Sequence, residues 1–118
     1  MAFYSKNVED DHVDFANTAI YFFSALANQR NFSFDTSSDW KKLTEPALKN
    51  YQLVMWLDDF PQLAVQRSGF ENYMEYGGIW LGFNVSAYND TDTKWPWFVQ
   101  FFGGAVFFDN NRPPYLQK

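Results

Sequence analysis

Cysteine is absent from this chain of 118 residues. Its absence excludes disulfides, thiolate metal sites and a cysteine nucleophile, and it gives no information about the redox compartment. No signal peptide is visible at the start of the sequence. We therefore expect a cytoplasmic protein, with a periplasmic or secreted protein whose signal has been removed as the alternative.

Clusters of basic residues and long apolar runs are also missing. The net charge is −5 and no block of Lys or Arg occurs, so a nucleic-acid partner is not expected. No apolar run approaches the roughly 18 residues of a membrane-spanning helix, so no membrane partner is expected either. The chain does have 14 Phe, 7 Tyr and 5 Trp residues. These are enough for the core of one domain covering residues 1–118.

The clearest structural pattern is a strand, a helix and a second strand between residues 51 and 88. The apolar run 53–57 predicts the first strand, residues 62–76 predict the helix, and the run 79–83 predicts the second strand. Strands that are apolar on both faces are typical of parallel sheets covered by helices. The sequence therefore predicts an α/β fold with a mostly parallel, flavodoxin-like sheet in three layers.

Weaker patterns flank this unit. Residues 2–5 resemble the end of a strand, and Phe15, Ala19, Phe22, Phe23 and Leu26 recur at the spacing of one helix face. Phe32–Phe34 alternates like a short strand, and Thr44 is a plausible cap for a short helix with Pro46 in its first turn. Residues 96–102 predict a helix begun by Pro96, and residues 105–108 predict another strand or extended segment.

Three polar residues follow the two central strands. Asp58 and Asp59 come directly after the first strand, and Asn84 comes directly after the second. Ligands of parallel α/β sheets bind beyond the carboxyl ends of the strands. His12, the single histidine, is placed near the same edge by the predicted first strand and helix. The sequence thus predicts a site at this edge.

The chain resembles the trehalose-utilisation (ThuA-like) family, whose fold is like that of class I glutamine amidotransferases. The resemblance covers roughly residues 2–114 and is carried by the following residues in order: Asp59-Phe60-Pro61, Gln66-Arg67, Phe70-Glu71, Tyr73-Met74, Gly77-Gly78, Gly82-Phe83 and Trp95-Pro96-Trp97. His12 also matches a histidine often found after the first strand of the family. The resemblance implies a role in carbohydrate utilisation.

Two features depart from the family pattern. The residue after Gly-Phe is typically histidine in the family, at the turn where related amidotransferases have a nucleophilic cysteine, but here it is Asn84. An amide is neither a base nor an efficient nucleophile. Family domains are also roughly twice as long, so we expect a partial family domain that is incomplete at its C-terminal end.

Each candidate residue has a structural alternative. His12 and Asp58 are the candidate bases, but they could instead hydrogen-bond to backbone or cap a helix. Asn84 and Asp59 are expected to bind substrate, and Ser86, too late in the turn to be a nucleophile, is a further expected contact. Aromatic residues also pack on sugar rings, although core packing is the stronger expectation for these side chains: Tyr88, Trp95, Trp97 and Phe98.

The family resemblance implies a function in the binding or processing of a sugar or keto-sugar. The sequence does not decide between an enzyme and a catalytically degenerate binding module. No cofactor is expected, with a divalent metal held by the paired carboxylates as a further option. Exposed aromatic residues of the tail (Phe101, Phe102, Phe107 and Phe108) predict a homodimer, because soluble monomers rarely expose large apolar patches.

Overall fold

The fold was analysed in a computed structural model, which describes residues 1–88, 92–101 and 103. The chain divides into two compact units, Met1–Ala87 and Tyr88–Lys118. The first unit contains the four-stranded sheet that the described residues form. Its strands are β1 (Ala2–Phe3), β2 (Thr36–Ser37), β3 (Leu53–Leu57) and β4 (Ile79–Phe83), all parallel and in the order β2-β1-β3-β4. The predicted flavodoxin-like order is confirmed.

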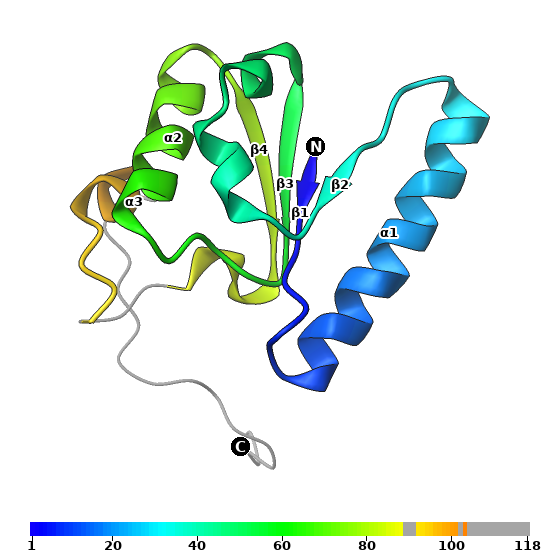
Figure 1. The fold of residues 1–118 in the computed structure, drawn as a ribbon, viewed down its shortest axis with the longest axis horizontal. Helices are drawn as coiled ribbons and strands as arrows, with labels where there is room; N and C mark the ends of the chain where they lie inside the picture. Colours follow the sequence, from blue (N-terminus) through cyan, green and yellow to red (C-terminus); the bar gives the residue numbers. More distant parts are fainter. Residues whose placement is uncertain (89–91, 102, 104–118) are drawn as a thin grey trace. The chain divides into compact units, whose positions relative to one another are not determined.

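Helices cover both faces of the sheet. Helix α1 (Asp10–Arg30) lies on one side of the strands, and α2 (Ala64–Glu75) lies on the other (Figure 1). Two short 3-10 helices, η1 (Trp40–Thr44) and η2 (Pro46–Asn50), connect β2 to β3. A third, η3 (Asn84–Ala87), follows β4 directly. The predicted three-layer α/β architecture is therefore present in the first unit.

Alternate residues of the central strands build two separate cores. On the α1 side, Met55 and Leu57 of β3 pack with Ala16 and Ala19 of the helix. Small alanines let α1 approach the sheet closely. On the α2 side, Trp56 is fully buried, with its ring centroid 4.4 Å from that of Phe70. The continuous apolar run in β3 is thus explained by burial on both faces.

Strand β4 is covered less completely than its sequence predicts. Ile79 and Leu81 alternate with Trp80 and Gly82, and they remain 62% and 42% exposed. Phe83, on the same face, is covered by Phe15 and Phe23 of α1. Helix α1 therefore covers only the carboxyl end of β4, and the expectation that this strand is buried on both faces is wrong.

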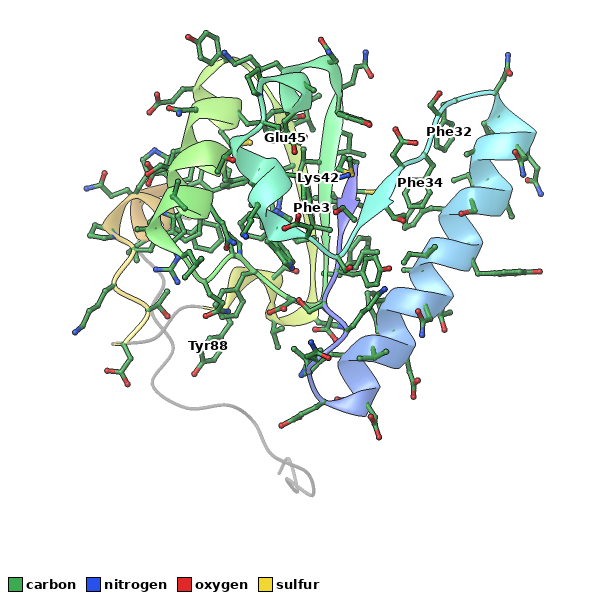
Figure 2. All side chains as sticks on the ribbon, viewed as in Figure 1. Phe3, Phe32, Phe34, Lys42, Glu45 and Tyr88 are labelled. Atoms are coloured by element: carbon green, nitrogen blue, oxygen red, sulfur yellow. The ribbon has the colours of Figure 1, made fainter. Side chains whose placement is uncertain are left out.

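Three local predictions also need correction. The strand predicted at Phe32–Phe34 lies three to four residues later, at β2. Phe34, labelled in Figure 2, belongs to a connector instead and packs against Phe23 of α1. The cap of η2 is Glu45, not Thr44, whose hydroxyl donates to the Lys41 carbonyl within η1. Phe22, predicted on the buried helix face, is 58% exposed.

The second unit contains α3 (Pro96–Phe101), as the Trp95-Pro96 sequence predicts. Within it the ring of Trp95 stacks on that of Phe98, with centroids 4.5 Å apart. The strand predicted at residues 105–108, together with Phe102, Phe107 and Phe108 of the predicted aromatic patch, lies outside the described residues.

Candidate active site at the carboxyl edge of the sheet

The order of the strands decides where a site can form. The chain runs from β1 through α1 to β2 on one side of β1, and then returns past β1 to β3 on its other side. The connections after β1 and β3 lead to α1 and α2, on opposite faces of the sheet, so they diverge between these two strands (Figure 1). In open parallel sheets this switch point leaves a crevice beyond the carboxyl ends of the two strands. The loop after β1 contains Ser5, and the loop after β3 contains Asp58 and Asp59.

Asp58 is the central residue of this edge. Its side chain is buried, with 5% of its surface exposed, and both carboxylate oxygens have partners. Oδ2 lies 2.6 Å from Nδ1 of His12, and Oδ1 accepts a hydrogen bond from the backbone N–H of Val85 at 3.1 Å. A single carboxylate thus connects the start of α1, the end of β3 and the turn after β4.

The backbone turns sharply after both central strands. Asp58 has φ 62° and Asn84 has φ 52°, which is the left-handed region. Asp and Asn enter this region more readily than other side chains, because their short polar groups bond to nearby backbone. The predicted tight turn after β4 is present, and Asn84 is exposed there. Strained backbone of this kind often occurs at functional sites.

His12 lies in the first turn of α1 and is oriented by Asp58. Because Nδ1 faces the carboxylate, Nε2 remains available for other partners, and it lies 3.9 Å from carboxylate oxygens of both Glu9 and Asp11. The hydrogen bond to Asp58 raises the pKa of His12 above its ordinary 6.5. Partial burial opposes this rise, and the negative charges of Asp58, Asp11 and Glu9 add to it.

Ligand atoms of Glu9, Asp11 and His12 lie within 4.8 Å of one another. A cation could in principle bind at such a group. Both acidic side chains are exposed, and exposed carboxylates commonly gather near a helix start without an ion, because the helix dipole favours them there. The predicted metal option, which placed the ion on Asp58 and Asp59, is not tested by this arrangement.

Asp59 has a different partner from the dyad of His12 and Asp58. Its Oδ2 accepts a short hydrogen bond from the hydroxyl of Ser5. The hydroxyl oxygen of Ser5 in turn accepts a hydrogen bond from the indole N–H of Trp40, at 3.0 Å. Neither Ser5 nor Trp40 was among the residues predicted from the sequence. The position of Ser5 directly beyond β1 was the available signal for it, whereas Trp40 had none.

The remaining predicted site residues are placed differently. Ser86 is fully buried, and its hydroxyl donates to the backbone carbonyl of Trp56 at 3.0 Å. This hydrogen bond connects η3 to β3, so Ser86 has a structural role. Tyr88, Trp95 and Trp97 belong to the second unit. The site described here consists of residues of the first unit alone.

The fold and this edge define a class of protein: a flavodoxin-like α/β protein whose polar residues gather at the switch point of a parallel sheet. The family model for trehalose utilisation, ThuA, matches residues 1–117. The chain therefore belongs to the ThuA family, as its sequence motifs indicated.

A solved structure supports the same conclusion. The crystal structure of a ThuA-like protein from Bacteroides uniformis has 43% sequence identity to the chain and a TM-score of 0.89. The match covers 96% of this chain and 46% of the other, so the chain spans about half the length of that protein. The comparison with curated proteins gave no match. In the part of the chain that the structure describes, no helix is long and apolar enough to cross a membrane.

Proposed function

We propose that this protein binds a sugar or keto-sugar at the carboxyl edge of the sheet, with His12 and Asp58 as its proton-transfer pair. The observation that supports this most strongly is the 2.6 Å contact between His12 Nδ1 and Asp58 Oδ2 at the switch point of the sheet. A buried carboxylate that holds one ring nitrogen fixes the orientation of the imidazole and leaves Nε2 to exchange a proton with a ligand.

In this proposal His12 is the base and Asp58 is the residue that orients it. Nε2 of neutral His12 would accept a proton from a sugar hydroxyl or from the carbon next to a keto group. The imidazolium formed would be stabilised by Asp58, in the way that a carboxylate supports histidine in other enzymes. Asn84, exposed at the turn after β4, would orient the ligand through its amide, which can both donate and accept hydrogen bonds.

The family supports a carbohydrate ligand. Its model is described by trehalose utilisation, which makes trehalose and its glucose unit the first compounds to test. Keto derivatives of the same sugars extend the panel, because a carbonyl acidifies the neighbouring C–H group and so gives a histidine base a proton to remove.

Calorimetry with this panel tests the proposal, with and without a divalent metal. We expect saturable binding of at least one sugar by the native chain, and a loss of about tenfold or more in the His12→Ala variant, because a hydrogen bond to a polar partner is removed. Binding that needs added Mg²⁺ or Zn²⁺ would support the metal option. Binding that His12→Ala leaves unchanged would favour a degenerate binding module whose ligand does not use the dyad.

Ser86→Ala is the matched control. It removes one buried hydroxyl, which donates to Trp56, and should lower the free energy of unfolding by about 1 kcal/mol. Sugar affinity should remain at the native value, because the hydroxyl is buried beneath the turn. A comparable loss of affinity in Ser86→Ala and His12→Ala would mean that both variants act through stability, and the proposal would then lose its support.

A further inference from the structure

A pocket of about 280 Å³ lies between η1 and the segment that follows β3. Its lining includes Ser5, Trp40, Asp59 and Gln62. Small-molecule pockets of proteins usually measure roughly 300–1,000 Å³, so this one is suited to a ligand of one ring rather than a larger compound. Two of its lining residues, Ser5 and Asp59, come from the loops that flank the switch point.

The chemistry of the lining is that of a site for hydroxyl groups. Asp59 accepts the hydroxyl of Ser5 with Oδ2, and among the described residues no hydrogen bond occupies Oδ1, which can accept from a ligand. Gln62 is exposed and provides an amide, which both donates and accepts. Trp40 brings an aromatic ring to the same pocket, and aromatic rings pack against the apolar faces of sugar rings.

Trp40 is held in place before any ligand arrives. Its ring stacks on Phe3 with a centroid distance of 5.3 Å and meets Trp56 edge-on at 5.9 Å. Its indole N–H donates to Ser5, whose hydroxyl binds Asp59. The chain Trp40–Ser5–Asp59 therefore fixes both an aromatic wall and a carboxylate, and preorganisation of this kind lowers the entropic cost of binding.

The charges of the lining indicate which sugars fit. Asp39 and Asp59 both line the pocket, against one cation, Lys41. Oδ1 of Asp39 accepts from the backbone N–H of Lys41, so this carboxylate is fixed at the start of η1. Two carboxylates would repel a phosphate or a sugar acid, and such repulsion produces specificity against the anionic ligand.

We infer that this pocket is the subsite for an uncharged sugar ring and that Asp59 makes it discriminate against phosphorylated sugars and sugar acids. The inference rests on the proposed function, because it states where the ring of the proposed ligand binds. In this inference Asp59 and Trp40 contact the sugar ring at a place separate from the dyad. The inference also states a preference for neutral over anionic sugars.

The test compares trehalose and glucose with glucose 6-phosphate and gluconate. The native chain should bind a neutral sugar at least tenfold more tightly than the matching anion. Asp59→Asn keeps the shape of the side chain and removes its charge. It should lower the affinity for the neutral sugar about tenfold and reduce the ratio between the affinities for the neutral sugar and the anion. Equal or tighter binding of glucose 6-phosphate by the native chain would overturn the inference.

A nuclear magnetic resonance titration separates this inference from the proposed function. The indole N–H signal of Trp40, assigned by its loss in Trp40→Phe, should move on addition of the neutral sugar. Movement of the His12 ring signals without any movement at Trp40 would contradict the pocket while leaving the dyad intact. If Trp40→Phe fails to fold, the backbone amide of Asp59, assigned in the native chain, reports on the same pocket.

Asp14→Asn is the matched control for the charge change. It also removes one carboxylate, but from an exposed side chain of α1 that does not line this pocket. The preference for the neutral sugar should persist in this variant. Equal loss of that preference in Asp14→Asn and Asp59→Asn would show a general effect of net charge and would contradict the role of Asp59.

Discussion

At the residue scale, the arrangement of Asp58 explains why His12 is oriented and why its pKa is raised. The carboxylate binds Nδ1 of the histidine with one oxygen and the backbone of Val85 with the other. Both candidate bases were predicted from the sequence, but their contact was not. They are 46 residues apart, and only the adjacency of β1 and β3 brings them together.

The pKa of His12 gives the first prediction. It should exceed 6.5 in the native chain, chiefly because Asp58 accepts its hydrogen bond. Asp58→Asn keeps an acceptor for Val85 and tolerates the left-handed backbone, but removes the negative charge, so it should lower this pKa. The chain has one histidine, so its ring protons give a single, unambiguous titration by nuclear magnetic resonance. An unchanged midpoint in Asp58→Asn would contradict the assigned cause.

The sign of the pH dependence follows from the raised pKa. A histidine whose pKa is higher in the folded state stabilises the fold fully below its unfolded value, near 6.5, and loses that contribution as pH rises through the folded pKa. A base must be neutral, so any activity that depends on His12 should increase over the same interval. Urea denaturation at several pH values should show the loss of stability, and it should be smaller in Asp58→Asn.

At the element scale, the packing of α2 against η1 depends on one residue without a side chain. A Cβ atom at Gly69 would lie 2.3 Å from the carbonyl oxygen of Leu43, which is backbone and has little freedom to move. Gly69→Ala should therefore lower the free energy of unfolding by roughly 1–3 kcal/mol, despite the better helix propensity of alanine. Urea or thermal denaturation measures the change.

Gly77→Ala is the comparison for this variant. Gly77 follows α2 with φ 87°, and nothing lies within 4 Å of a Cβ placed there. Its substitution should cost about 1 kcal/mol through backbone strain alone, without disturbing the packing of α2 on η1. A smaller loss for Gly69→Ala than for Gly77→Ala would show that the contact with Leu43 relaxes easily and that this interface is not closely packed.

The elements differ in how well their sequences predict them. The unit β3–α2–β4 was predicted nearly to the residue, because long apolar runs and Gly77-Gly78 mark its boundaries. Strand β2 was misplaced, because a strand of two residues shows no periodicity and Phe32–Phe34 offered a stronger pattern. Gln66 is polar, but it is buried and its side chain accepts from the backbone of Leu63 at the helix start. Because this capping hydrogen bond satisfies the amide oxygen, the polar side chain of Gln66 is buried.

At the scale of the whole molecule, the least covered part of the sheet is β4. Among the described residues this strand pairs only with β3, and it exposes Ile79 and Leu81 on the α1 side. In the second unit, Phe101 is 41% exposed. Exposed strands and apolar side chains tend to associate with other chains. These features support the homodimer that the sequence suggested, which stays a prediction.

The homodimer can be tested directly. Size-exclusion chromatography with light scattering should give twice the chain mass at tens of micromolar. Leu81→Lys, on the exposed face of β4, should shift the equilibrium toward monomer, whereas Tyr21→Lys, also exposed but on α1, should leave it unchanged. A monomer in the native chain at these concentrations would contradict the prediction. Equal effects of both variants would show that β4 is not the interface.

The proposed sugar binding depends on a histidine that a buried carboxylate orients at the switch point of the sheet. It is tested most directly by following the ring protons of His12 while trehalose, glucose and their keto derivatives are added. We expect a saturable shift with at least one of these sugars, and a higher sugar concentration at half-saturation in Asp58→Asn. Signals that stay unmoved up to saturating concentrations of every sugar would contradict it.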